Sequence, residues 1–262
     1  MNIIKTTVCS IAIAGATAAF IGTSAQAISF GVQPGNNSPT GEIDQGAFSE
    51  FAEREGFATV NFNDLNDQFK AIEYSSGNAI DGFATYTFSN SNGASKVVPT
   101  SSSAMRWSPD GANNEVNDSS YLQVFSNSTV TIDLAETLNY FGINWGSASR
   151  GNVFSFFKGN NLVGSFDVND IAAEGFAFTG TKSGQGTGYV DFRSESEEDN
   201  FDRIVISQIG GGGFETDNHT FRIGTGQFSP DDQSQDVPEP GSLLGLLAVG
   251  LLGSKKLLKQ KP

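Results

Sequence analysis

The side chains that most often carry out catalysis are scarce in this chain, which has one histidine and one cysteine. A Ser-His-Asp or Cys-His triad would have to use His219, which lies in a strand-like segment with no serine elbow elsewhere. Cys9 belongs to an apolar N-terminal run, so a single imidazole without a thiolate also disfavours zinc. No Gly-x-x-x-x-Gly-Lys-Ser/Thr phosphate loop is present. We therefore expect no enzymatic activity, with glycoside hydrolysis by an unidentified pair of carboxylates as the alternative.

Oxygen-bearing side chains near the two ends of the central region form the strongest candidate for a binding site. Asn63 and Asp64 follow the first predicted strand, and Glu215, Asp217 and Asn218 lie in the last one. These segments resemble the first- and last-strand motifs of extracellular jelly rolls, several of which hold a structural calcium there. Calcium takes roughly six to eight oxygen ligands. The sequence requires no cofactor, but it makes a structural calcium a candidate. The alternative is that Asp217-Asn218 form a turn and Asp64 caps a loop.

The two tryptophans bear on carbohydrate binding, because pyranose rings stack on exposed aromatic faces. Trp107 lies in a polar stretch, so its ring is the candidate for sugar stacking. Trp145 alternates with Phe141 and Ile143, so we expect it in the core. A calcium-dependent, lectin-like carbohydrate-binding module that acts on exopolysaccharide is therefore an alternative function.

From Gly56 onward, apolar residues alternate with polar or small ones, the pattern of strands that bury one face. Turn-forming clusters separate these strands, and Lys158-Gly-Asn-Asn161 predicts the best-defined hairpin. The chain contains 31 glycines and 22 phenylalanines, enough for many turns and an aromatic core. We predict an all-β, jelly-roll-like antiparallel β-sandwich over residues 44–229. The alternating sets are Ala58-Val60-Phe62, Ala84-Tyr86-Phe88, Val130-Ile132-Leu134, Phe141-Ile143-Trp145, Phe154-Phe156 and Ile204-Ile206.

Short helices and flanking segments complete the predicted domain. Apolar residues at helical spacing predict an amphipathic helix over residues 45–55. A second short helix is expected over residues 170–174, capped by Asn169 or Asp170. Residues 28–43 lack periodicity and are expected to form a loose leader, and residues 230–236 are expected to form a polar linker.

Residues 1–27 have the organisation of a secretory signal peptide. Lys5 precedes an uncharged run that ends in Ala25-Gln26-Ala27, so we expect cleavage after Ala27. The mature chain then has no cysteine and must rely on its own core for stability. Without residues 1–27 and 239–262, 10 basic and 28 acidic residues remain, a net charge of −18. This charge disfavours nucleic acid as a partner.

The C-terminus, residues 237–262, combines three features. Val237-Pro238-Glu239-Pro240 precedes the uncharged segment 241–254, and Lys255 and Lys256 begin a terminal basic cluster. As a helix, the 14 residues of this segment would span about 21 Å, less than the roughly 30 Å of a bilayer's hydrocarbon core. We therefore expect a short transmembrane helix that anchors the chain transiently, with its lysines in the cytoplasm.

These three features, in this order, resemble the sorting signal of PEP-CTERM proteins. The resemblance implies an exosortase and the secretion machinery as partners, and delivery to the cell surface or extracellular matrix of a Gram-negative bacterium. The stretches Tyr140-Phe-Gly-Ile-Asn-Trp145 and 152–167 resemble an exosortase-dependent surface-protein family seen in cyanobacteria, which offers no catalytic residues to carry over. We expect a non-enzymatic surface or exopolysaccharide-matrix protein; a plain tail anchor is the alternative reading of the C-terminus.

Overall fold

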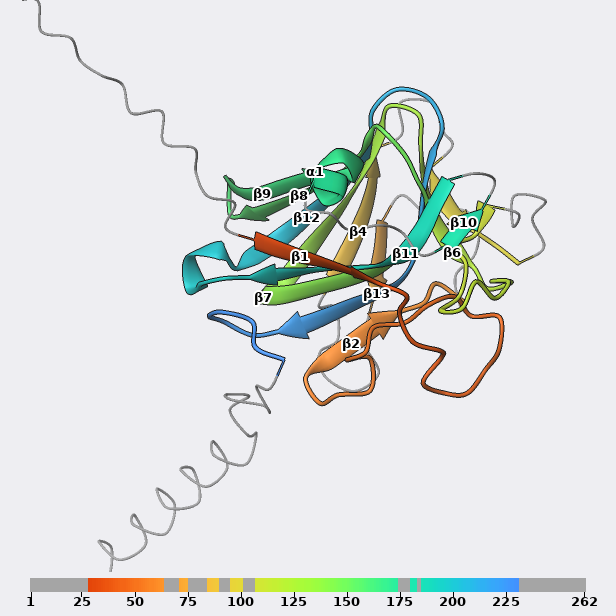
Figure 1. Cartoon of the computed structure of the whole chain (residues 1–262). Helices are drawn as coiled ribbons and strands as arrows, with labels where there is room; N and C mark the ends of the chain where they lie inside the picture. The colour runs from red at the N-terminus through yellow and green to blue at the C-terminus, as the bar shows by residue number, and fades with distance from the viewer. Residues whose placement is uncertain are drawn as a thin grey trace, which may run out of the picture.

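Alternating apolar and polar residues produce antiparallel strands over most of the folded region (Figure 1). The computed structural model describes residues 28–63, 71–74, 84–89, 95–100, 107–173, 180–182 and 185–230. The elements in these ranges are β1 (Ile28–Gln33), β2 (Phe57–Val60), β3 (Ala71–Tyr74), β4 (Ala84–Ser89), β5 (Lys96–Val98), β6 (Tyr121–Phe125), β7 (Ser128–Ala148), β8 (Asn152–Lys158), β9 (Asn161–Asp167), α1 (Val168–Ala173), β10 (Gly180–Lys182), β11 (Gln185–Ser194), the 3-10 turn η2 (Glu197–Asp199), β12 (Phe201–Gln208) and β13 (Gly213–Ile223).

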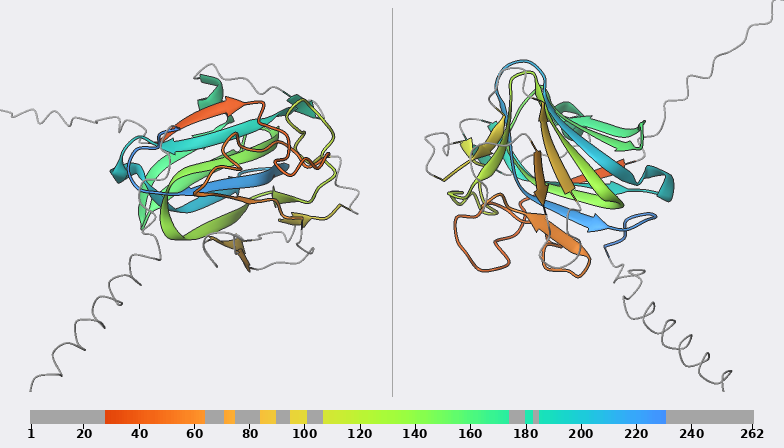
Figure 2. Two further views of the ribbon diagram at one scale, coloured as in Figure 1. Left: turned by 90° about the horizontal axis from the view of Figure 1, so that it is seen from below. Right: turned by 180° about the vertical axis from the view of Figure 1, so that it is seen from behind.

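Strand β7 joins two layers of sheet. Its first half, residues 128–134, pairs with β4 and β12, and its second half, residues 138–148, pairs with β11 and β13. The first layer therefore runs β3-β4-β7-β12-β8-β9. The second runs β1-β11-β7-β13-β6-β5, with β10 also on β11 and β2 also on β13 (Figure 2). The antiparallel β-sandwich predicted from the alternation is confirmed.

Phenylalanine rings fill the space between the layers. The rings of Phe154 and Phe156 in β8 lie 5.0 and 4.8 Å from that of Phe192 in β11. Phe154 also lies 4.9 Å from Phe214 of β13. Edge-to-face and tilted pairs of this kind contribute about 0.5–1.5 kcal/mol beyond the area they bury. Trp145 is fully buried among them, as predicted, and its Nε1 donates to Oδ1 of Asn152 (3.3 Å).

Residues 34–56, here called the strap, cross the outer face of the second layer (Figure 1). The predicted helix over residues 45–55 is wrong, because the chain there consists of turns and bends and Phe48 forms an antiparallel bridge with Asn36. Asp44 and Gly46 have positive φ angles of 60° and 77°, which a right-handed helix does not allow. Phe48 and Phe51 are buried anchors of the strap, so their helical spacing reflects two contacts with the sheet.

The predicted loose leader is also wrong for its first six residues. Residues 28–33 form β1, which pairs along its full length with β11, and Ile28 is 1% exposed. The signal was present in the sequence, because Ile28, Phe30 and Val32 alternate with Ser29, Gly31 and Gln33.

Two local predictions are confirmed. The hairpin between β8 and β9 turns at Gly159, whose φ is +59°. Helix α1 forms near the predicted position, but its cap is Asp167: Oδ1 accepts from the backbone N of Asn169 (2.6 Å) and of Asp170 (3.1 Å). Oδ2 of Asp170 accepts in return from the backbone N of Asp167 (2.8 Å). This reciprocal pair is a capping box, which places the start of the helix two residues earlier than predicted.

Replacing Phe192 by alanine should remove the ring that contacts Phe154 and Phe156 across the two layers. A Phe→Ala change in a packed core costs about 3–5 kcal/mol of unfolding free energy, measurable by urea denaturation of the secreted protein. Leu162→Ala is the control, because Leu162 is 57% exposed and such surface changes stay within about 0.5 kcal/mol. Similar losses for the two variants would contradict the central role of Phe192.

Candidate functional site

The strap lies on a buried polar face of the second layer. Gly142 of β7 makes room for two tyrosine hydroxyls there, because a Cβ at this position would lie 2.6 Å from Oη of Tyr189 and 2.8 Å from Oη of Tyr140. The Tyr140 hydroxyl shares a hydrogen bond with Ser49 Oγ of the strap (2.8 Å). Oη of Tyr189 donates to the carbonyl of Asn218 (3.3 Å). These hydrogen bonds allow polar groups to be buried at little cost.

Asp217 of β13 is the most deeply buried acid on this face, directly opposite Asn144 of β7. Its Oδ2 accepts from Nδ2 of Asn117 (2.9 Å) and from Oγ of Ser119 (3.1 Å). Its Oδ1 accepts from the backbone N of Asn218 (2.8 Å). Burial disfavours the charged form and raises the pKa of Asp217 to about 8, although these donors partly oppose the shift.

Asn218 fixes the strap to the sheet. It lies at a register shift between β13 and β7 and has a positive φ of 48°. Its Nδ2 donates to the carbonyls of Gln45 (2.7 Å) and Ala47 (3.0 Å). Between these residues, Gly46 fits beneath the side-chain amides: an added Cβ would lie 2.7, 2.8 and 3.0 Å from the Nδ2 atoms of Asn117, Asn144 and Asn218.

The structure brings most of the predicted calcium ligands to one end of the domain. Asn63 is exposed; its Nδ2 donates to Oε1 of Gln45 (2.7 Å), and its Oδ1 accepts from the backbone N of Ser120 (3.0 Å). Residues 117–120 thus connect Asn63 to Asp217. Asp64 lies outside the described residues.

Glu215 lies on the same face of β13 as Asp217, two residues earlier, and accepts from Nε2 of Gln123 (3.4 Å). Burial raises its pKa to about 7, with the hydrogen bond from Gln123 opposing the shift. Within the described ranges, no three His, Cys, Asp or Glu side chains are grouped closely enough to hold a metal ion. The oxygens of Asp217 accept from N–H and O–H donors, so these residues do not form a calcium cage by themselves. A calcium completed by Asp64 stays a prediction.

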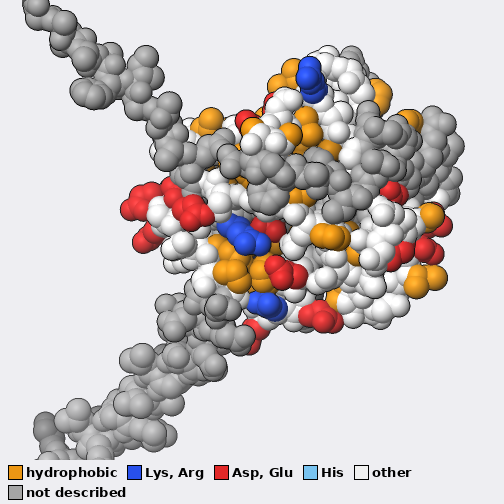
Figure 3. Space-filling view, in the orientation of Figure 1, with side chains coloured by type: hydrophobic (Ala, Val, Ile, Leu, Met, Phe, Trp, Pro, Cys, Tyr) orange, Lys and Arg blue, Asp and Glu red, His pale blue; other side chains and the backbone are white. Residues whose placement is uncertain are grey.

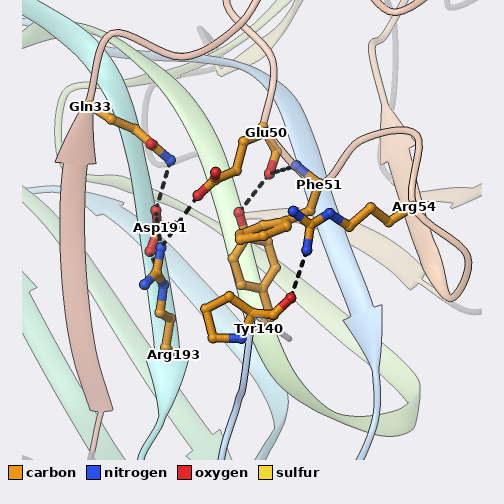
Figure 4. Close-up of polar contacts among 9 residues, drawn as sticks. Gln33, Glu50, Phe51, Arg54, Tyr140, Asp191 and Arg193 are labelled. Atoms are coloured by element: carbon orange, nitrogen blue, oxygen red, sulfur yellow. Dashed lines mark hydrogen bonds and ion pairs between the residues drawn. The ribbon is translucent and has the colours of Figure 1, made fainter. Parts of the chain in front are cut away.

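A third buried acid, Asp191 of β11, lies under the strap near its other end (Figure 4). Nε of Arg193 lies 2.6 Å from its Oδ1, and Nε2 of Gln33 donates to its Oδ2 (3.1 Å). Glu50 of the strap lies 4.0 Å from Arg193. Burial raises the pKa of Asp191 to about 6, because desolvation outweighs the attraction of Arg193.

His219 is a structural residue of the core. It is fully buried, with Nδ1 3.0 Å from Oη of Tyr86 and Nε2 2.9 Å from Oγ1 of Thr216. The ring of Phe62 stands edge-on to it at 4.9 Å. Burial lowers the pKa of His219 to about 3, so the imidazole is neutral at physiological pH. A ring enclosed in this way cannot reach a substrate.

Trp107 is half-buried, next to the buried residues Ser108 and Pro109. Pro109 packs over Gly146 of β7, where an added Cβ would lie 2.8 Å from the Cα of the proline. The tryptophan is therefore held close to the sheet, and its proposed role in sugar stacking stays a prediction.

The loops formed by residues 37–46 and 107–118, together called the loop pole, line two adjoining hollows. Their volumes are about 340 and 670 Å³. Both are lined by Gly41, Glu42, Ile43 and Gln45, and Ile43 is 80% exposed between them. The larger hollow is also lined by Asn63, Thr100 and Ser119. A third hollow of about 360 Å³ lies beside Gly159. The buried acids of the sheet line none of these three hollows.

The described region is thus an all-β domain, and no helix in it is long and apolar enough to cross a bilayer. The predicted transmembrane segment 241–254 lies outside the described residues. Residues 236–259 match the model of the PEP-CTERM protein-sorting motif. The match supports an exported protein that an exosortase sorts. No curated protein matches the chain.

The three buried acids predict that the protein is more stable in mild acid. Their raised pKa values mean that the folded chain binds these protons more tightly than the unfolded chain. The stability they contribute is therefore fully present below the unfolded pKa of roughly 4. It is lost as the pH rises through the folded pKa values of about 6 for Asp191, 7 for Glu215 and 8 for Asp217. Denaturant unfolding should give a free energy that falls from about pH 4 to about pH 8.

Asp217→Asn should flatten the upper part of this dependence, because the amide keeps an acceptor oxygen and cannot ionise. Removing a charge from the exposed Glu195 by Glu195→Gln is the control for general charge repulsion. A constant or rising free energy over this range in the unmodified protein would contradict the burial of these acids.

Proposed function

We propose that this chain is a non-enzymatic β-sandwich protein of the cell surface or extracellular matrix, delivered there by exosortase-dependent sorting. The match of residues 236–259 to the sorting motif carries the proposal. The signal peptide predicted over residues 1–27 supports it, because such a segment directs the chain across the inner membrane before sorting. A domain held together by aromatic packing also needs no disulfide outside the cell.

The chemistry of the described residues supports a non-enzymatic role. A general acid needs a raised pKa and access to substrate. Asp191, Glu215 and Asp217 have the raised pKa, but they are buried and line none of the three hollows. His219 is equally enclosed. Display of a stable acidic domain is therefore the function that this geometry favours.

The sorting proposal is tested by producing the full chain in a Gram-negative host with and without an exosortase. With the enzyme, mass spectrometry should find a released protein that begins at Ile28 and lacks the segment 241–254. Glu239→Ala combined with Pro240→Ala should leave the uncut chain in the membrane fraction. The control is Gln233→Ala, which changes the preceding stretch and keeps the motif. Equal release without the exosortase would refute the proposal.

A second candidate function, carbohydrate binding, is favoured by the two hollows of the loop pole. Amides, hydroxyls and carboxylates line them, and Ile43 offers an apolar contact. Two buried oxygens nearby, Oδ1 of Asn144 and Oδ1 of Asn218, have no hydrogen-bond donor in the described structure. They are the groups that could serve a calcium ion together with Asp64, since calcium binds neutral amide oxygens as well as carboxylates.

This second candidate predicts that the secreted protein binds a glycan on an array and that chelator weakens the binding. Asp118→Asn at the larger hollow and Trp107→Ala should each reduce the affinity at least tenfold. Glu195→Gln, outside the loop pole, should leave it unchanged. A structural calcium should also raise the thermal unfolding midpoint, so an unchanged midpoint in chelator would remove it. An array without signal would leave only the surface-protein description.

A further inference from the structure

The chain does not leave the domain freely at the end of β13. Residues 224–230, here called the clasp, fold back along the end of the second layer (Figure 1). The backbone N of Phe228 donates to the carbonyl of Ser194 (2.8 Å), at the last residue of β11. Asn200, with its amide oriented to satisfy its neighbours, donates to the carbonyl of Gly226 (2.9 Å) and accepts from its backbone N (2.8 Å). The clasp thus has its own set of hydrogen bonds.

The side chain of Phe228 anchors the clasp. It is buried in a cluster with Phe51 of the strap, Phe57 of β2 and Tyr140 of β7, at ring separations of 5.5, 6.4 and 4.9 Å. This cluster lies on the outer face of the second layer, separate from the main core. The anchor is therefore packed separately from the core between the layers.

Arginines complete the clasp. The guanidinium carbons of Arg193 and Arg222 lie 5.5 and 5.6 Å from the centre of the Phe228 ring, within the range of cation–π attraction. Arg54 of the strap lies over the ring of Phe51 (4.5 Å), and its Nη1 donates to the carbonyl of Pro230 (2.6 Å; Figure 4). Figure 3 shows basic and apolar side chains side by side on this face. Within the described residues, the last contact with the domain is therefore at Pro230.

This anchoring limits how far the sorting motif extends from the domain. Seven Cα-to-Cα steps separate Pro230 from Val237, so the two cannot be more than about 25 Å apart in any conformation. An open clasp would move the last fixed residue back to Ile223 and double the limit to about 50 Å. A domain of this length has a radius of gyration of about 17 Å. The closed clasp therefore keeps the motif within about one and a half such radii of the surface.

We propose that the clasp is a positioning device for sorting: it limits how far the exosortase cleavage motif can extend from the folded domain. The proposal rests on exosortase processing of residues 237–240. It assigns Phe228 and Arg54 a role in that processing, through the reach of the chain. It also means that the face formed by the clasp and residues 50–56 of the strap is the one turned toward the processing enzyme and its membrane.

The test combines a shortened linker with an opened clasp. Deleting residues 232–235 leaves three Cα-to-Cα steps between the clasp and the motif, a reach of about 10 Å. We expect this deletion to slow processing at least tenfold in a host with the exosortase, measured by pulse-chase and mass spectrometry. Replacing the four residues by Gly-Ser-Gly-Ser should restore the rate, which shows that length matters.

Opening the clasp should also restore processing of the shortened chain, because residues 224–230 then add to the linker. Phe228→Ala opens the anchor. Arg54→Ala removes the hydrogen bond to Pro230 and the cation–π contact with Phe51 but keeps the Phe228 ring, and it should restore the rate partly. Phe166→Ala is the matched control: it removes a buried ring from the main core and leaves the clasp intact. Circular dichroism of the secreted variants checks folding, and Arg54→Ala carries the test if Phe228→Ala does not fold.

The outcomes separate this proposal from the proposed function. An unmodified chain that the exosortase does not process would refute the proposed function itself. A processed unmodified chain, combined with normal processing of the shortened one, would refute the role of the clasp. The role of the clasp would also be refuted if the shortened chain stayed uncut when it carried the Phe228→Ala or Arg54→Ala substitution and was correctly folded. Rescue by Phe166→Ala as well would assign the effect to general destabilisation.

Discussion

The packing of phenylalanine rings between two layers that share one long strand is the interaction on which the rest of the structure depends. Because β7 pairs with four other strands along its length, the layers cannot separate without breaking its ladders. The rings of Phe154, Phe156 and Phe192 then fill the wedge between them. Cleavage at the predicted site after Ala27 would leave no cysteine, and so no disulfide, to substitute for this contact. The aromatic interior therefore serves to stabilise the fold.

The outer face of the second layer follows a different rule. Its groups are polar, yet the strap buries them, so nearly every one must find a hydrogen-bond partner. The side-chain amides of Asn117 and Asn218 meet this need by binding a carboxyl oxygen and two strap carbonyls. Asp217 meets it by accepting from Asn117, Ser119 and the backbone N of Asn218, while burial raises its pKa to about 8. Buried acids of this kind are therefore structural, and the exposed surface available to a ligand is formed by the loops.

The all-β sandwich class and several local features could be predicted from the sequence, and the path of the strap could not. The turn at Gly159 and the burial of Trp145 depend on a few neighbouring residues, whose conformational preferences are visible in the sequence. The strap depends on contacts such as that between Asn218 and Gln45, which are 173 residues apart, so the spacing of Phe48 and Phe51 was mistaken for a helix. The calcium candidates were chosen for their oxygens. In the structure, the carboxylate oxygens of Asp217 accept hydrogen bonds from N–H and O–H donors. These contacts depend on the path of residues 117–120, which the sequence does not show.

Both ends of the described domain meet at one residue. Ile28 pairs with Ser194 in the ladder of β1 and β11, and the carbonyl of Ser194 accepts from Phe228 of the clasp. The loop pole lies at the opposite end of the sandwich (Figures 1 and 2). Because its ends are adjacent, the domain can be inserted into a surface loop of an unrelated carrier protein without distorting either polypeptide. It can also be circularly permuted, by joining its two ends and opening new termini at the Gly159 turn. The architecture is therefore that of a portable module that presents its far loops wherever it is inserted.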